Sequence, residues 1–194
     1  MIVEKALNQS IRRRFGLVAG AVALSMASAS SMAAIVYSGP VNIPIPDTID
    51  GIYMNIVTGA TGSSGGSVPG YDINPYSALA GQLNLWGPTT AVWLSTVDIN
   101  GSYTHALGTI VGSGGQYFRP GGNIEIPLTA NSSDNYLAFQ FTNESTGATN
   151  YGWLQLQVGA SPGTRAIIAY AYENAGASIP VGTTPVSLQN FSID

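Results

Sequence analysis

Cysteine is absent from this 194-residue chain, and basic residues are scarce after its first fourteen positions. Without cysteine there are no disulfides, no thiolate metal ligands and no catalytic thiol. Beyond residue 33, nine acidic residues face only Arg119 and Arg165, which gives that part of the chain a net charge of −7. This charge excludes the clustered Lys and Arg by which proteins bind nucleic acid and anionic membranes. The single histidine, His105, excludes a metal site built from several histidines.

Amphipathic helices and long apolar runs are also lacking after residue 33. No segment there keeps an apolar stripe at i, i+3, i+4 and i+7 over three turns, and glycines and prolines interrupt every stretch. No later stretch reaches the twenty or so apolar residues that a membrane-spanning helix needs. The sequence therefore predicts neither a helical domain nor a membrane span in the mature chain.

The first 33 residues have the three parts of a bacterial export signal. Lys5 and the run Arg12-Arg13-Arg14 form a basic start, residues 15–29 form a short apolar middle, and small residues follow to Ala34. We expect cleavage after Ala33, with a cut after Ala29 as the alternative. Because Arg12-Arg13-Arg14-Phe15 is similar to a twin-arginine signal, both the general secretory and the twin-arginine routes stay open. The mature chain, residues 34–194, is expected to be a single domain that is secreted, periplasmic or on the cell surface.

Alternation of apolar and polar residues dominates the mature chain and is typical of β-strands. In residues 136–142, Leu137, Phe139 and Phe141 point to one face, and in residues 153–158 the apolar face carries Leu154, Leu156 and Val158. Eight or nine short strands separated by Gly, Pro and Asn turns predict an all-β fold. We expect an antiparallel β-sandwich or a jelly-roll-like barrel. Further strands are predicted at residues 35–45, 52–57, 82–86, 91–97, 105–111, 124–128 and 165–172.

Several short motifs resemble a family of secreted bacterial β-sandwich proteins, many of which carry a PEP-CTERM (Pro-Glu-Pro) sorting signal. The matching segments are 51–55, 71–75, 150–154, 169–174 and 179–182, with Asn-Tyr-Gly-Trp-Leu and Ala-Tyr-Ala-Tyr-Glu-Asn in the last third. The resemblance implies a β-sandwich exported to the cell surface, and it implies no particular activity because the family is largely uncharacterised. The sequence lacks the sorting motif itself, so we expect release, or attachment by other means.

Aromatic and amide side chains predict a sugar-binding surface on two of the strands. Trp153 falls on the face of Gln155 and Gln157, whereas Tyr170 and Tyr172 share a face with Ile168 in their own strand. An exposed face of this kind suits a sugar ring, which stacks on aromatic side chains and binds polar groups at its edge. The candidate ligand-binding residues are therefore Trp153, Gln155, Tyr170 and Tyr172. We favour the alternative, in which both faces are partly covered and these aromatics fill the core or the ends of the sheets.

Two other kinds of site have candidate residues. Asp72 with Asn74, and Asp98 with Asn100, place hard oxygen ligands in turns, as a structural calcium ion requires, although Asp and Asn are also ordinary turn residues. Glycoside hydrolysis needs two carboxyl groups at a set separation. Glu125, Glu144 and Glu173 are the only glutamates after residue 33, and their spacing brings no two of them together. No catalytic residue is therefore assigned, and no cofactor is expected beyond the candidate calcium ion.

These observations favour an exported, acidic protein that acts by contact. The expected role is a non-catalytic structural or adhesive component of the cell surface or extracellular matrix. The alternative is a soluble glycan-binding module, and a glycoside hydrolase is a further alternative. The expected partners are a second copy of the chain or an extracellular polysaccharide.

Overall fold

The structure is a computed structural model that describes residues 33–76, 82–88, 93–95, 103–118, 124–159 and 164–185. All of them belong to one compact unit, residues 31–194. In these residues every strand pairing is antiparallel, and the only helical segment is the 3-10 turn η1 at Gly65–Ser67. The prediction of an all-β, antiparallel fold is confirmed. The expected signal peptide, together with Asp98 and Asn100, lies outside the described residues.

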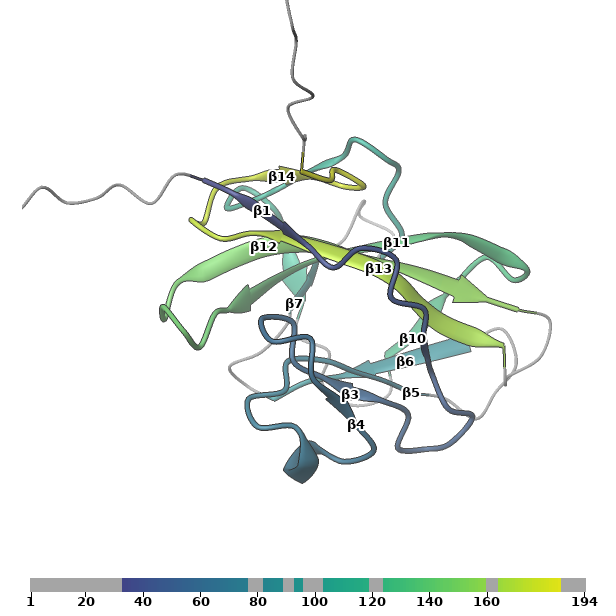
Figure 1. Cartoon of the computed structure of the whole chain (residues 1–194). Helices are drawn as coiled ribbons and strands as arrows, with labels where there is room; N and C mark the ends of the chain where they lie inside the picture. Colours follow the sequence, from purple (N-terminus) through teal and green to yellow (C-terminus); the bar gives the residue numbers. More distant parts are fainter. Residues whose placement is uncertain are drawn as a thin grey trace, which may run out of the picture. The chain divides into compact units, whose positions relative to one another are not determined.

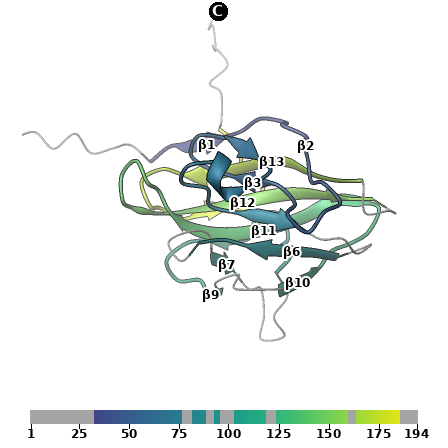
Figure 2. The same cartoon turned by 90° about the horizontal axis from the view of Figure 1, so that it is seen from below.

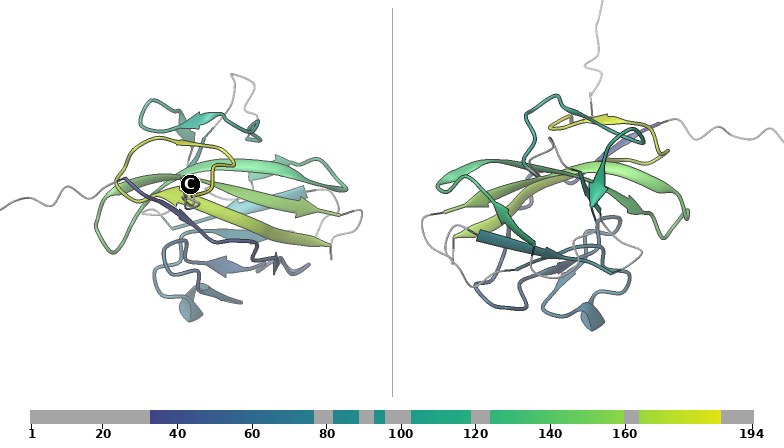
Figure 3. Two further views of the ribbon diagram at one scale, coloured as in Figure 1. Left: turned by 45° about the horizontal axis from the view of Figure 1, so that its top comes forward. Right: turned by 180° about the vertical axis from the view of Figure 1, so that it is seen from behind.

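The largest sheet has seven strands and is built around three long ones. These run side by side through the middle of the fold, with β12 between β11 and β13 (Figures 2 and 3). The sheet order is β1-β13-β12-β11-β7-β9, and β2 also pairs with β13. The bounds are β1 Ile35–Tyr37, β2 Ile43–Pro44, β7 Trp93–Ser95, β9 Tyr117–Phe118, β11 Ser132–Thr142, β12 Thr149–Val158 and β13 Arg165–Glu173.

Smaller sheets lie on both sides of the long strands (Figure 1). On one side lie the three-stranded sheet β10-β6-β5 and the pair β3-β4, and on the other lies the pair β8-β14. Their bounds are β3 Tyr53–Met54, β4 Thr61–Gly62, β5 Asn74–Tyr76, β6 Gln82–Trp86, β8 Ile110–Val111, β10 Ile124–Pro127 and β14 Ile179–Pro180. Both faces of the large sheet are therefore covered.

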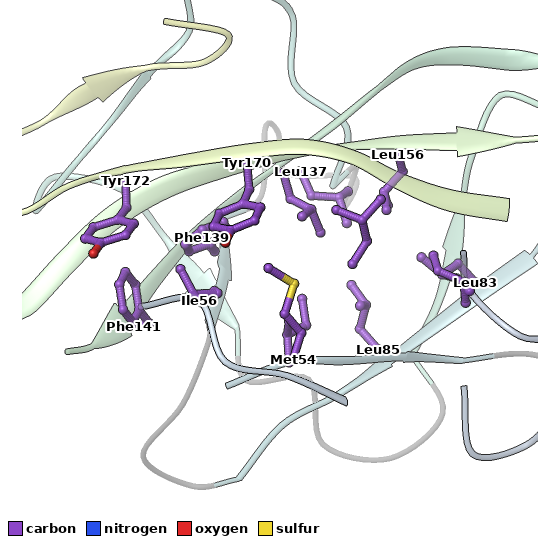
Figure 4. Packing of buried hydrophobic residues seen from close by; sticks show 14 residues of the cluster. Met54, Ile56, Leu83, Leu85, Leu137, Phe139, Phe141, Leu156, Tyr170 and Tyr172 are labelled. Carbon is purple, nitrogen blue, oxygen red and sulfur yellow. The ribbon is translucent and has the colours of Figure 1, made fainter. Parts of the chain in front are cut away.

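The main hydrophobic core lies between the large sheet and the side that carries β3 to β6. Figure 4 shows Met54, Ile56 and Leu85 facing Phe139 and its neighbours across this core. The alternation read from the sequence produces it, because successive strand residues point to opposite faces. The buried members are Ile45, Met54, Ile56, Ile73, Leu83, Leu85, Leu137, Phe139, Phe141, Leu154, Leu156, Ile167, Tyr170 and Tyr172.

A second core fills the opposite face of the large sheet. It combines small residues of β11 and β13 with the rings of Tyr151 and Trp153 on β12, and β8 and β14 cover it. The Gln face of β12 is therefore not a solvated outer surface at Trp153. The buried members are Val111, Ala138, Tyr151, Trp153, Ala169, Ala171, Ile179 and Val181.

Two local departures from regular strands differ from the sequence predictions. The single strand expected at residues 35–45 is divided into β1 and β2, because Gly39 and Asn42 between them have positive φ angles of 70° and 48°. Between β12 and β13, Gln155 pairs with Ala169 whereas the next residue, Leu156, pairs with Ile167. A bulge in β13 therefore leaves Ile168 without a partner residue in β12. As a result Ile167, and not Ile168, shares the core face with Tyr170 and Tyr172.

Candidate functional site

The structure separates the four predicted sugar-binding residues. Trp153 lies in the second core, where its Nε1–H donates a hydrogen bond to the carbonyl of Thr183 over 3.2 Å. Its ring is 6.0 Å from the ring of Tyr37 and also 6.0 Å from that of Tyr136. Gln155 is half-buried and donates from Nε2 to the carbonyl of Ser133 over 3.0 Å. These contacts place Trp153 inside the second core and tie Gln155 to the neighbouring strand β11.

Tyr170 and Tyr172 belong to the main core on the opposite face. They are 7% and 4% exposed, and the ring of Tyr172 meets Phe141 edge-on at 5.2 Å. Burial raises the pKa of both tyrosines, and the neighbouring carboxyl groups of Glu144 and Asp72 raise that of Tyr172 further. The four residues therefore do not form one exposed stacking surface.

The described members of the calcium candidates do not converge on one point. Asn74 donates from Nδ2 to the carbonyls of Asp50 and Ile52, over 2.7 and 3.1 Å, so its side chain fixes the chain leading into β3. Asp72 accepts a hydrogen bond from the backbone N–H of Ile56. In the part of the chain that the structure describes, no group of three or more His, Asp or Glu side chains could hold a metal ion.

The three glutamates, Glu125, Glu144 and Glu173, lie in different parts of the fold. Glu173 is buried, and its carboxylate accepts hydrogen bonds from the backbone N–H groups of Ala175 and Ala177, which closes the turn after β13. Glu144 is exposed in the turn between β11 and β12. The side chain of Glu125, in β10, lies outside what the structure describes. Glu144 nevertheless has an acidic neighbour, Asp72, that the sequence did not pair with it.

Three half-buried aromatic side chains meet beside Glu144 and define what we call the aromatic cluster: Tyr53, Tyr71 and Trp86. The ring of Tyr71 meets Tyr53 edge-on with centroids 4.9 Å apart, and stacks on Trp86 with centroids 5.8 Å apart. Tyr53 comes from β3, Trp86 from β6 and Tyr71 from the segment that enters β5. Three segments far apart in sequence thus present their rings together.

A hollow of about 310 Å³, the Glu144 hollow, opens on one side of the aromatic cluster. Tyr71 is its aromatic wall, and Asp72, Thr142 and Glu144 are its polar side chains. Glycine is needed at two of its edges. A Cβ at Gly65 would lie 2.6 Å from the ring of Tyr71, and Gly70 has a φ of +67°, which L side chains rarely adopt.

A buried amide, Asn55, holds this hollow together. Its Nδ2 donates to the carbonyl of Gly70 over 2.8 Å and to Oε1 of Glu144 over 2.6 Å, while its Oδ1 accepts from the N–H of Thr58. One side chain therefore joins the β3–β4 turn, the glycine-rich segment before Tyr71 and the β11–β12 turn. The Gly/Ser-rich composition of segment 59–70 predicts a loop. In the structure this segment includes β4 and η1 and forms one wall of the hollow.

Asp72 is the unusual acid of the Glu144 hollow because it is only 4% exposed and no basic residue accompanies it in the described lining. Burial raises its pKa from 3.8 to about 7; the hydrogen bond from Ile56 acts in the opposite direction, and the charge of Glu144 adds to the rise. Near neutral pH its carboxyl group is therefore present in both its protonated and its ionised form. No Lys, Arg or His is present among the described residues that line the hollow.

A second hollow, the Ile49 hollow, also borders the aromatic cluster and measures about 260 Å³. Tyr53 and Trp86 of the cluster form part of its wall, and Ile49, at 78% exposed, stands at its edge. The remaining lining residues are Asn74 and Tyr76. The rings of the aromatic cluster therefore contribute to the walls of both hollows.

The sequence contains a signal for two members of the aromatic cluster. In residues 52–57 Tyr53 alternates with the core residues Ile52, Met54 and Ile56, and in β6 Trp86 follows the buried Leu85. An aromatic residue on the polar face of an alternating strand faces away from the core that its neighbours fill. The proximity of Asp72 to Glu144 had no such signal, because it depends on a contact across the fold.

Among the described residues, no helix has the length and apolar character to cross a membrane. Comparisons of the chain with protein-family models, with curated proteins and with solved structures found no match, so the geometry of the two hollows and the aromatic cluster carries the functional argument.

Proposed function

We propose that this chain is an exported, non-catalytic β-protein of the bacterial cell surface or extracellular matrix that adheres by binding polysaccharide at the aromatic cluster. The observation that carries this proposal is the stacked, half-buried Tyr71–Trp86 pair, in which each of the two rings lines a hollow. Sugars present flat C–H faces that stack on aromatic rings, and their hydroxyl groups need polar partners at the ring edge. Glu144, Asp72 and Thr142 are such partners on one side.

Polysaccharide binding accounts for adhesion better than polymerisation of the chain does. Strand addition requires a long open sheet edge, and proteins avoid it by keeping their edge strands short. The outer described strands of the large sheet are β1 and β2 at one end and β9 at the other, and they have three, two and two residues. An adhesive role through a ligand needs no such edge.

The test is depletion of the purified protein from solution by insoluble uncharged polysaccharides such as cellulose, curdlan and chitin. The wild type should bind at least one of them saturably, and Trp86→Ala should weaken that binding about tenfold or more, about 1.4 kcal/mol for each factor of ten. The matched control is Tyr37→Ala, which removes a half-buried ring from the opposite face of the large sheet. Failure of the wild type to bind any of the three, or equal loss in the control, would refute the proposal.

A further inference from the structure

We infer that the two hollows are neighbouring subsites for a single uncharged, β-linked hexose chain, and that the acidic side chains of the Glu144 hollow exclude polyuronic acids. This inference rests on the proposed polysaccharide binding and adds the class of ligand and its mode of binding. It predicts that the protein recognises the interior of a glycan chain and not a single sugar.

Each of the two hollows is small for a complete binding site. Small-molecule sites usually have volumes of about 300–1,000 Å³, and the two hollows measure about 310 and 260 Å³. Each one is therefore at or below the lower limit for a complete binding site. A ligand that gains useful affinity must occupy both.

The position of the rings joins the two volumes. Tyr71 lines the Glu144 hollow, Trp86 lines the Ile49 hollow, and the two rings are stacked with an interplanar angle of 26°. Tyr53 closes the cluster on the Ile49 side. A chain of β-linked hexoses has flat faces that follow one another along its length, and such a chain can lie over the cluster and extend into the hollow on either side.

Charge decides between uncharged and acidic glycans. The Glu144 hollow contains the carboxyl groups of Asp72 and Glu144, and the described lining of both hollows lacks any basic side chain. Oxygen atoms of these acids can accept hydrogen bonds from sugar hydroxyl groups, but they repel a uronate carboxylate. Discrimination of this kind works by destabilising the wrong ligand.

The experiment is calorimetric titration of the full chain with β-1,4-gluco-oligosaccharides of increasing length, from glucose to the hexasaccharide, and with oligogalacturonates of the same lengths. The inference predicts that affinity rises at least tenfold between the monosaccharide and the longest gluco-oligosaccharide, and that oligogalacturonates do not bind. Equal affinity for all gluco-oligosaccharide lengths, or equal binding of the uronates, would overturn the inference and leave polysaccharide binding intact. If neither series binds saturably although the protein binds one of the insoluble polysaccharides, the inference is overturned and the proposed function is not. If the insoluble polysaccharides do not bind either, both are overturned.

Two variants test the two hollows separately. Ile49→Ser removes an apolar side chain that is mostly exposed, and it should weaken binding of the hexasaccharide several-fold without changing the unfolding temperature. Glu144→Gln keeps an oxygen that can accept from Asn55, and it should make binding of oligogalacturonates measurable. The matched control is Asp134→Asn, an exposed acid-to-amide change in β11 that lines neither hollow. If Asp134→Asn produced the same gain in uronate binding, net charge and not the hollow would explain the selectivity.

Discussion

Replacing the buried acid Asp72 by asparagine should stabilise the protein at alkaline pH. In the folded protein burial raises the pKa of Asp72 to about 7, from its ordinary 3.8. The folded state therefore retains a proton that the unfolded state has lost, and the stability contributed by this group falls as pH rises from about 4 to about 7. A pKa difference of about three, at about 1.4 kcal/mol for each pKa unit, gives a loss of about 4 kcal/mol at most.

Asparagine at position 72 does not titrate, and its Oδ1 can still accept the hydrogen bond that Asp72 accepts from Ile56. The variant should match the wild type near pH 4 and exceed it by a few kcal/mol at pH 8, with the difference growing through the interval between. Charges that face Asp72 change the position of this interval, and Glu144 is the one that raises it. In a Glu144→Gln background, Asp72→Asn should therefore stabilise the protein less at pH 8 than it does in the wild type.

Urea unfolding followed by circular dichroism, at pH 4 and at pH 8 with EDTA present, measures this difference. The control is Asp134→Asn, which is exposed and should change the free energy of unfolding by no more than about 0.5 kcal/mol at either pH. If Asp72→Asn instead lowered stability at pH 8, the Asp72 carboxylate would have a cationic partner in the folded protein. The reasoning from uncompensated burial would then be refuted.

Two further substitutions test the packing of the large sheet. Gly152→Ala would place a Cβ 2.4 Å from the carbonyl oxygen of Ala171 and 2.6 Å from the ring of Phe139. We therefore expect urea unfolding to show a free energy of unfolding lower by about 1–3 kcal/mol. An unchanged urea midpoint would contradict the close contact. Trp153→Phe removes the hydrogen bond to Thr183, and it should lower the free energy of unfolding by about 1–2 kcal/mol while leaving glycan affinity unchanged. Weaker glycan binding by this variant would show that the second core belongs to the site.

The strands and the core were predictable from the sequence because they depend on a local period of two. Leu137, Phe139 and Phe141 alternate with polar or small residues, and all three are buried on one face of β11. The alternation could not reveal that a second layer, β8 with β14, covers the opposite face of the sheet. For that reason the sequence leaves two positions open for Trp153, on the Gln face, and the structure places it in the second core.

The candidate site was less predictable because non-local contacts assemble it. Asn55 and Glu144 are 89 residues apart in the chain, and their hydrogen bond depends on the packing of β3 against the β11–β12 turn. A bulge such as the one at Ile168 also changes which face of the sheet the neighbouring side chains point to, without any change in amino-acid composition. The alternation of apolar and polar residues predicts that Tyr53 and Trp86 face away from the core. It does not predict that their rings contact Tyr71.

The most direct test of the central claim is to map, by NMR, where a glycan binds on the wild-type chain. During titration with a β-1,4-linked gluco-hexasaccharide, the account predicts saturable shifts at the indole N–H of Trp86 and at the backbone amides of Tyr71 and Glu144. The indole N–H of Trp153, which donates to Thr183, should not move. Shifts confined to the face of the sheet that carries Trp153, or no shifts at all, would contradict polysaccharide binding at the aromatic cluster.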